Sequence, residues 1–307
     1  MSPAFRSLPD ADRVFTVTMP DGAVLPVYGL DGPAAAPVLL FGHANGMAAG
    51  SYAPFLRLLA RRMRVFAFDA RGHGGATWPE GPLETVFAVD RMADDVAEVT
   101  NAVAAAANAA RIAYAGHSLG AVAALRLAAT GRAPDWTVLV AFEPPIFPPP
   151  GARAHDEAVG KQTLLVAGTM KRRAHWDSPA ALVARLKGRG MFARFDPAML
   201  EAHARATLMP APEGGFRLCC PPAVESFIFA SHWHADTWSR LGAIARDVEL
   251  IGGDPATPDN DWISSALPEM AAAMPRARLV QVAGTGHLLI SEQPSRCADL
   301  VCERILR

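Results

Sequence analysis

The chain has 307 residues, 51% of them hydrophobic and 19% charged, and 29 basic against 30 acidic residues leave a formal net charge of −1. This length allows one large core, with or without an insertion, and the balanced charge argues against nucleic-acid or anionic-membrane partners. No segment resembles a signal peptide or a membrane span, and the four cysteines lack CxxC spacing, so we expect a cytoplasmic protein with reduced thiols.

Short β-rich segments alternate with helical ones along most of the chain. The first two predicted strands flank Pro20-Asp21-Gly22, a turn sequence that predicts an antiparallel hairpin. Apolar residues at three- and four-residue spacing predict an amphipathic helix over 89–103. The pattern as a whole predicts an α/β fold, with a mostly parallel eight-stranded sheet covered by helices on both faces. The predicted strands lie at residues 13–19, 23–30, 37–41, 64–69, 111–115, 137–142, 248–251 and 278–282.

The alternation stops between about 145 and 245. This stretch begins with PPIFPPPG (144–151), whose prolines fix φ and exclude regular structure. Helical segments rich in Arg, Trp, Phe and Met follow. We therefore predict a core made of 1–144 and 246–307, interrupted by a helical lid at 145–245 that shapes an apolar pocket.

The stretch GHSLG (116–120) lies where the fifth predicted strand meets a helix. Small residues at both ends allow a tight, strained turn that exposes a serine above a sheet, so the pattern predicts Ser118 as a nucleophile. A hydroxyl needs a base, and the base needs an orienting acid. His287 follows the last predicted strand and Asp254 follows the strand before it, so the three residues occur in the order nucleophile, acid, base.

Together with FGHANGM (41–47), FDARGHGGA (68–76) and GTGH (284–287), these motifs resemble the α/β-hydrolase fold superfamily and its capped, esterase-like serine members. The resemblance implies an oxyanion hole from the backbone N–H groups of Leu119 and Asn45. Some members take their triad acid from the end of the sixth strand, where Glu143 stands here. We favour Asp254 over Glu143 because its Asp-x-x-x-Pro loop resembles the usual acid loop.

The expected reaction is hydrolysis of a small apolar carboxylic ester, or of a lactone or thioester, through an acyl-enzyme on Ser118. A C–C bond hydrolase, a perhydrolase or an iminopeptidase would use the same triad, and a slow-turnover ligand-binding member of the fold is a further alternative. Haloalkane dehalogenases and epoxide hydrolases use an aspartate nucleophile, which Ser118 argues against.

The expected ligand is a small-molecule substrate, with neither a metal nor an organic cofactor. No dinucleotide, P-loop or His-Glu-x-x-His motif is present, and the His-x-His pair at 232 and 234 lacks a third ligand of suitable spacing. The side chain of His117 is expected to diverge from the Ser118 hydroxyl. The residues expected to border the substrate pocket are His43, His117, Trp176, Phe192, His232 and Trp233.

Overall fold

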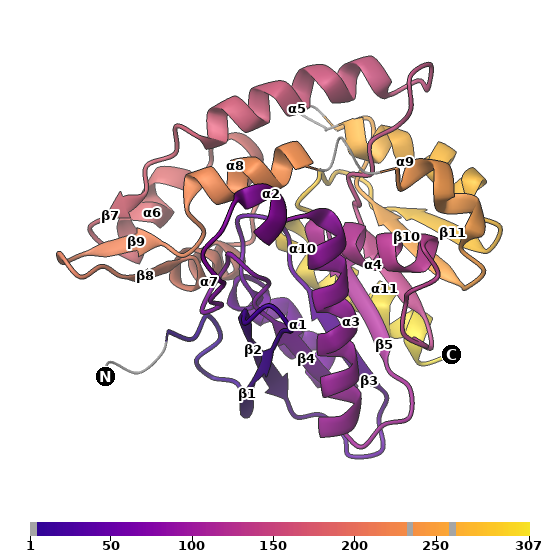
Figure 1. The fold of residues 1–307 in the computed structure, drawn as a ribbon, viewed down its shortest axis with the longest axis horizontal. Coiled ribbons are helices and arrows are strands. Elements are labelled where there is room, and N and C mark those ends of the chain that lie inside the picture. The colour runs from indigo at the N-terminus through magenta and orange to yellow at the C-terminus, as the bar shows by residue number, and fades with distance from the viewer. Residues whose placement is uncertain (1–4, 232–235, 258–261) are drawn as a thin grey trace.

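The computed structural model describes residues 5–231, 236–257 and 262–307 (Figure 1). One sheet of eight strands runs through it in the order β1-β2-β4-β3-β5-β6-β10-β11. β2 pairs antiparallel with β1 and with β4, and all the other neighbours are parallel. The predicted fold class is therefore confirmed. The strands are β1 (Arg13–Thr18), β2 (Val24–Leu30), β3 (Val38–Gly42), β4 (Arg64–Phe68), β5 (Ala113–His117), β6 (Leu139–Phe142), β10 (Val248–Gly252) and β11 (Ala277–Gln281).

Local sequence explains the first two predicted elements. The hairpin of β1 and β2 turns at Gly22, whose φ of 88° is a conformation that glycine adopts without a steric cost. The predicted amphipathic helix is α3 (Val89–Ala106), which buries Val96, Val99 and Val103 against the sheet and Met92 in a smaller cluster with Leu119. Both predictions are confirmed.

Helices cover both faces of the sheet, as the alternating pattern requires. One face packs against α3, α4 (Leu119–Ala129) and α9 (Trp262–Ala273), and the other packs against α1 (Ala53–Ala60) and α11 (Pro294–Ile305). Two short helices, α2 (Leu83–Val86) and α10 (Leu289–Glu292), lie in loops beside the sheet. The apolar side chains of the two faces form the two largest buried clusters of the molecule.

An inserted region separates β6 from β10, and its described part supplies no strand to the eight-stranded sheet. Figure 1 shows α5 and α8 lying across one end of the core, with the short strands beyond them. These strands form a separate small sheet in the order β7-β9-β8, which the sequence did not predict. The region contains α5 (His155–Thr169), β7 (His175–Trp176), α6 (Pro179–Leu186), η2 (Gly190–Phe192), α7 (Pro197–Ala206), β8 (Leu208–Pro210), β9 (Phe216–Leu218), α8 (Pro222–Ser231) and η4 (Trp238–Ala243).

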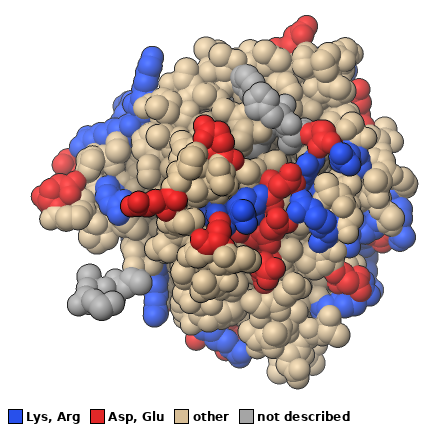
Figure 2. Space-filling model, in the orientation of Figure 1, with Lys and Arg blue, Asp and Glu red and all other residues tan. Residues whose placement is uncertain are grey.

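Acidic and basic side chains are interleaved on the face shown in Figure 2. Arg126 on α4 pairs with Asp90 on α3 and with Asp236, which precedes η4, and Arg132 pairs with Asp90 and Asp94. The Arg126–Asp236 pair ties the end of the inserted region to α4, and the other pairs join α4 and the following Arg132 to α3. Within the described residues, no helix is both long and apolar enough to cross a membrane.

Parallel strands place the loops that follow them at one edge of the sheet. The loops after β3, β5, β6, β10 and β11 carry, in that order, Asn45, Ser118, Glu143, Asp254 and His287. Every residue that was predicted for the catalytic chemistry therefore lies at the same edge.

Candidate active site

Ser118 is the single residue between β5 and α4, and its backbone conformation is strained. Its φ of 50° is a region that non-glycine residues rarely occupy, and such strain is common at functional sites. A Cβ atom on Gly116 would lie 2.6 Å from the carbonyl carbon of Gly120, and one on Gly120 would lie 2.4 Å from the Gly42 oxygen. Only glycine fits at both positions, so the GHSLG sequence makes this turn sterically possible.

Three side chains from three loops meet at this elbow. The Ser118 Oγ lies 3.2 Å from His287 Nε2, and His287 Nδ1 lies 3.3 Å from Glu143 Oε2. Ser118 and Glu143 are buried, whereas the His287 side chain keeps 18% of its surface exposed. The arrangement is a hydrogen-bonded series of hydroxyl, imidazole and carboxylate, the geometry of a serine triad.

The Glu143 carboxylate is held by two further donors. Its Oε1 accepts the backbone N–H of Gly253 at 2.7 Å and the hydroxyl of Ser264 at 2.6 Å. Glu143 itself has a φ of 43°, a left-handed conformation at the end of β6. Since Oε1 is occupied by these donors, Oε2 is the oxygen that faces His287.

Asp254 does not partner His287, contrary to our preference for it as the acid. Its carboxylate accepts the backbone N–H groups of Gly284 and Ala256, which lower its pKa below the usual value. The side chain is therefore engaged with its own loop and with the loop that carries His287. The Asp254 loop contributes to the site through a different group, the N–H of Gly253 that binds Glu143.

Replacing Ser264 with Ala is expected to lower kcat about tenfold, because Glu143 Oε1 then keeps only one donor and its carboxylate is free to turn away from His287. Ser264 is fully buried on α9 and lies outside every sequence motif. Steady-state kinetics of Ser264→Ala and Ser264→Thr would check this, because Thr retains the hydroxyl. Equal kcat values for the wild type, Ser264→Ala and Ser264→Thr would show that the Gly253 N–H is sufficient to position the Glu143 carboxylate.

The elbow and the loop that follows β3, which meet where the Gly120 N–H donates to the His43 carbonyl, each carry an unpaired backbone N–H group. In the part of the chain that the structure describes, the N–H groups of Leu119 and Asn45 have no hydrogen-bond partner, although both residues are buried. On either side of Asn45, the N–H of Ala44 donates to Tyr52 Oη and the N–H of Gly46 lies 3.0 Å from His73 Nε2. Unpaired N–H groups in buried residues are uncommon in proteins, so both groups are available to bind a ligand oxygen.

Of the residues predicted to border the pocket, His43 braces a loop. Its Nδ1 donates to the Ala44 carbonyl at 2.8 Å, and its Nε2 accepts the N–H of Ala70 at 2.9 Å. Burial lowers the pKa of His43 to about 4, which keeps the ring neutral. His117 is likewise buried, and its two ring nitrogens contact Tyr52 and the His287 carbonyl.

The aromatic residues of the inserted region lie partly in a cluster of that region and partly in a cluster shared with the core. Trp176 packs with Leu182 and Leu218 around the small sheet, and its Nε1 donates to the Arg173 carbonyl. Phe192 packs against Phe195 and the His203 ring with tilted ring planes, beside the cluster that α1 and α11 form in the core. His232 and Trp233 lie outside the described residues.

No sequence pattern indicates the ion pair that lies beside the loop following β3. Arg172 pairs with the buried carboxylate of Glu225 on α8, and a Cβ on Gly46 would lie 2.2 Å from Glu225 Oε1. The Glu225 carbonyl also accepts the side-chain N–H of Asn45 at 2.9 Å. The inserted region therefore rests directly on the loop that carries one of the two unpaired N–H groups.

A second ion pair joins the inserted region to the histidine loop. Arg194 donates to Glu292 on α10 at 2.8 Å, and the Glu292 carboxylate accepts the N–H of Gly286, the residue before His287. The backbone N–H of Asp196 also donates to the Ser291 carbonyl at 2.8 Å. Residues 194–196 thus anchor the loop that presents His287.

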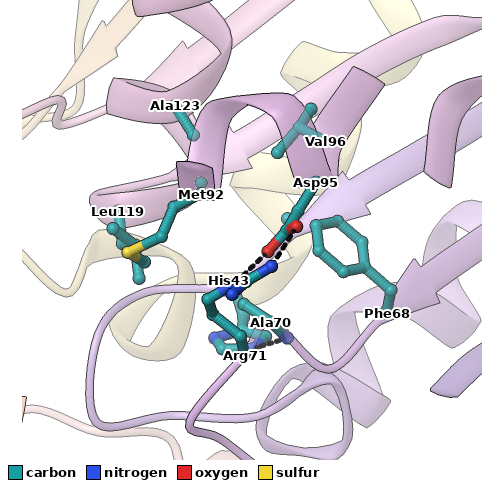
Figure 3. A pocket seen from close by; sticks show the side chains of 11 residues that line it. His43, Phe68, Ala70, Arg71, Met92, Asp95, Val96, Leu119 and Ala123 are labelled. Atoms are coloured by element: carbon teal, nitrogen blue, oxygen red, sulfur yellow. Dashed lines mark hydrogen bonds and ion pairs between the residues drawn. The ribbon is translucent and has the colours of Figure 1, made fainter. Parts of the chain in front are cut away.

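Figure 3 shows the side chains around a small cavity whose lining includes Leu119 and Gly120 of the elbow. Its volume is about 10 Å³, which holds roughly one water molecule, and its lining does not include Ser118. It is too small for a substrate. The side chains around it include His43, Phe68, Arg71, Asp95 and Leu119.

The described residues hold no cluster of three or more His, Cys, Asp or Glu side chains placed to bind a metal ion. The four cysteines are buried and form no disulfide; they are Cys219, Cys220, Cys297 and Cys302. The chemistry that this site offers comes from the serine, imidazole and carboxylate and from the two N–H groups.

Comparison with solved structures identifies the same fold in hydrolases of low sequence identity. An E-2-(acetamidomethylene)succinate hydrolase superposes with a TM-score of 0.77 at 21% identity, covering 96% of this chain and 100% of that one. A thermophilic esterase from Thermogutta terrifontis, with malate bound, gives 0.65 at 19% identity, covering 96% and 98%. The enol-lactonase from Burkholderia xenovorans LB400 gives 0.64 at 19% identity, covering 95% and 100%.

No curated protein matches the sequence significantly. The family model described as "Alpha/beta hydrolase family" matches residues 38–300, which span the elbow, the inserted region and all three side chains of the series. The chain belongs to the alpha/beta hydrolase family.

Proposed function

We propose that the protein is a serine hydrolase that cleaves a carboxylic ester, lactone or thioester through an acyl-enzyme on Ser118. The observation that carries this proposal is the series Ser118–His287–Glu143 with two unpaired backbone N–H groups beside the serine. The proposed triad acid is Glu143 rather than Asp254.

In the acylation step, Ser118 Oγ attacks the carbonyl carbon while His287 Nε2 takes the hydroxyl proton. The imidazolium that forms is stabilised by Glu143 Oε2 at Nδ1. The carbonyl oxygen becomes an oxyanion, which the N–H groups of Leu119 and Asn45 bind. Collapse of this intermediate breaks the bond to the leaving group, which receives the proton from Nε2.

Deacylation repeats these roles with water. His287 Nε2 removes a proton from the water as its oxygen attacks the acyl carbon, and the same two N–H groups stabilise the second oxyanion. The bond to Ser118 Oγ breaks, the proton returns to the serine, and the acid is released. No step needs a redox change, so the serine, histidine and carboxylate are sufficient for hydrolysis.

We infer that the inserted region at 145–245 acts as a lid that gives the pocket an apolar wall. Val224 and Ile228 on α8 pack in one buried cluster with Leu119, the residue after the proposed nucleophile. An apolar wall beside the scissile carbonyl favours an uncharged acyl or alcohol group. The esterase and the lactonase among the structural neighbours are compatible with this class, although their low identity supports the fold alone.

The test has two parts, of which the first asks whether Ser118 is reactive. A fluorophosphonate probe should label the wild-type protein on Ser118, as mass spectrometry of the labelled peptide would show. The second part measures turnover of p-nitrophenyl esters of graded acyl length, beside lactones, thioesters and β-diketones. We expect the highest kcat/KM for an uncharged ester, lactone or thioester.

Two results would contradict the proposal in different ways. Turnover of β-diketones above that of every ester would move the function to C–C bond hydrolysis with the same residues. Absence of labelling and of turnover would support a ligand-binding use of the fold.

A further inference from the structure

His117 precedes the proposed nucleophile, and its ring lies in a buried chain of hydrogen bonds that the proposed reaction does not use. His117 Nδ1 lies 2.6 Å from Tyr52 Oη, and Nε2 lies 2.8 Å from the carbonyl oxygen of His287. Tyr52 and His117 are both fully buried. The His117 ring is also 5.2 Å from the His287 ring, measured between centroids.

The direction of each hydrogen bond follows from the acceptor at one end. A backbone carbonyl can only accept, so His117 Nε2 must carry the proton that reaches the His287 oxygen. Burial lowers the pKa of His117 to about 3, so the ring is neutral and Nδ1 is an acceptor. The Tyr52 hydroxyl therefore donates to Nδ1. Met47 Sδ also lies 3.0 Å from this hydroxyl, but a thioether is a weaker acceptor than an imidazole nitrogen.

The series of hydrogen bonds continues into the loop that follows β3. Tyr52 Oη accepts the backbone N–H of Ala44 at 3.3 Å, and the next N–H along the chain is the unpaired one of Asn45. One continuous path therefore runs from Ala44 through Tyr52 and His117 to the backbone of His287. It joins the loop that would bind the oxyanion, the elbow and the loop of the proposed base.

We propose that His117 and Tyr52 are positioning residues that hold the backbone of His287, and the loop of Asn45, in register with Ser118. The geometry favours this role because His117 is fixed to the elbow, one residue from the proposed nucleophile, and binds the main chain of the proposed base. A shift of about 1 Å between such groups can cost about a hundredfold in rate. The inference rests on the proposed function, since it concerns how the same triad is aligned.

The experiment compares three variants with the wild type. Tyr52→Phe removes the donor to Nδ1 and the acceptor of the Ala44 N–H, His117→Ala removes the whole link, and His117→Gln places an amide N–H near the position of Nε2. We expect the rate of fluorophosphonate labelling of Ser118, and kcat for the best ester, to fall about 10- to 100-fold in Tyr52→Phe and His117→Ala. KM should stay within about twofold, and His117→Gln should recover most of the lost rate.

The matched control is Tyr28→Phe. Tyr28 is equally buried and donates its hydroxyl to Asp69 at 2.8 Å, far along the sequence from the elbow. The Tyr28→Phe variant should lose about as much thermal stability as Tyr52→Phe, and its labelling rate should equal that of the wild type. A merely structural role of Tyr52 would lower the melting temperature of both variants and the labelling rate of neither.

A second readout does not depend on turnover. The ¹⁵N shifts of His117 should show the Nε2-protonated neutral tautomer throughout pH 5 to 9 in the wild type. Protonation of His117 within this range, or wild-type labelling rates in both Tyr52→Phe and His117→Ala, would overturn the inference while leaving the serine hydrolase proposal intact. If the wild-type protein is not labelled at all, the proposed function fails and this inference fails with it.

Discussion

Replacing Ser118 with Ala is expected to lower kcat about 10⁶-fold, and His287→Ala is expected to have a similar effect. Ala lacks the hydroxyl that would form the acyl-enzyme, and loss of the imidazole removes the group that would take its proton. The two effects should not add, because each residue is useless for nucleophilic attack without the other. Discontinuous assays at high enzyme concentration, with the best ester of the panel, would measure the residual rate.

A buried serine on the inserted region provides the control for this substitution. Ser226 donates its hydroxyl to the Val166 carbonyl and contacts no member of the proposed triad. Ser226→Ala should therefore keep kcat within about threefold of the wild type. Ester turnover by Ser118→Ala at a near-normal rate would end the acyl-enzyme proposal.

Glu143→Gln is expected to lower kcat about 10⁴-fold, the loss known for a triad carboxylate replaced by its amide. The N–H of Gly253 and the hydroxyl of Ser264 both need an acceptor, so the amide oxygen would take the place of Oε1. The amide nitrogen would then face His287 Nδ1. Because that nitrogen is a donor, it would favour the tautomer in which Nε2 carries the proton and cannot accept one from Ser118.

Asp254→Asn provides the matched comparison. The N–H groups of Ala256 and Gly284 bind different oxygens of Asp254, so Asn retains an acceptor for one of the two, and neither contact involves His287. We expect its kcat to stay within about threefold of the wild type. Circular dichroism and thermal melts would establish that both variants are folded, and a larger loss in Asp254→Asn than in Glu143→Gln would return the acid to the loop after β10.

Local sequence was sufficient for the architecture and for the strained elbow at Ser118. Gly116 and Gly120 permit a strained turn at Ser118 that other residues cannot form. The five-residue sequence GHSLG is enough to recognise this restriction. The same holds for the hairpin at Gly22 and for the buried stripe of α3, because turn residues and helical periodicity act within a few positions. His287 could be chosen from nine histidines because it follows the last strand of the sheet.

The partner of His287 depended on the tertiary structure. β6 and β10 are neighbours in the sheet and end at the same edge, so the sequence placed both Glu143 and Asp254 near the histidine loop. Their order along the chain could not decide between them. The two differ in their contacts, most of which are non-local: Gly253 and Ser264 hold Glu143, whereas Gly284 and the neighbouring Ala256 hold Asp254.

The rest of the site is non-local for the same reason. Tyr52 and His117 are 65 positions apart, and Arg172 reaches the loop of Gly46 from the inserted region, so no short motif records either contact. The strands of the small sheet are only two or three residues long, which is too short for a period-two pattern. Steric and periodic restrictions act between near neighbours and can be read from the chain, whereas the pairing of polar groups is settled only when distant segments pack together.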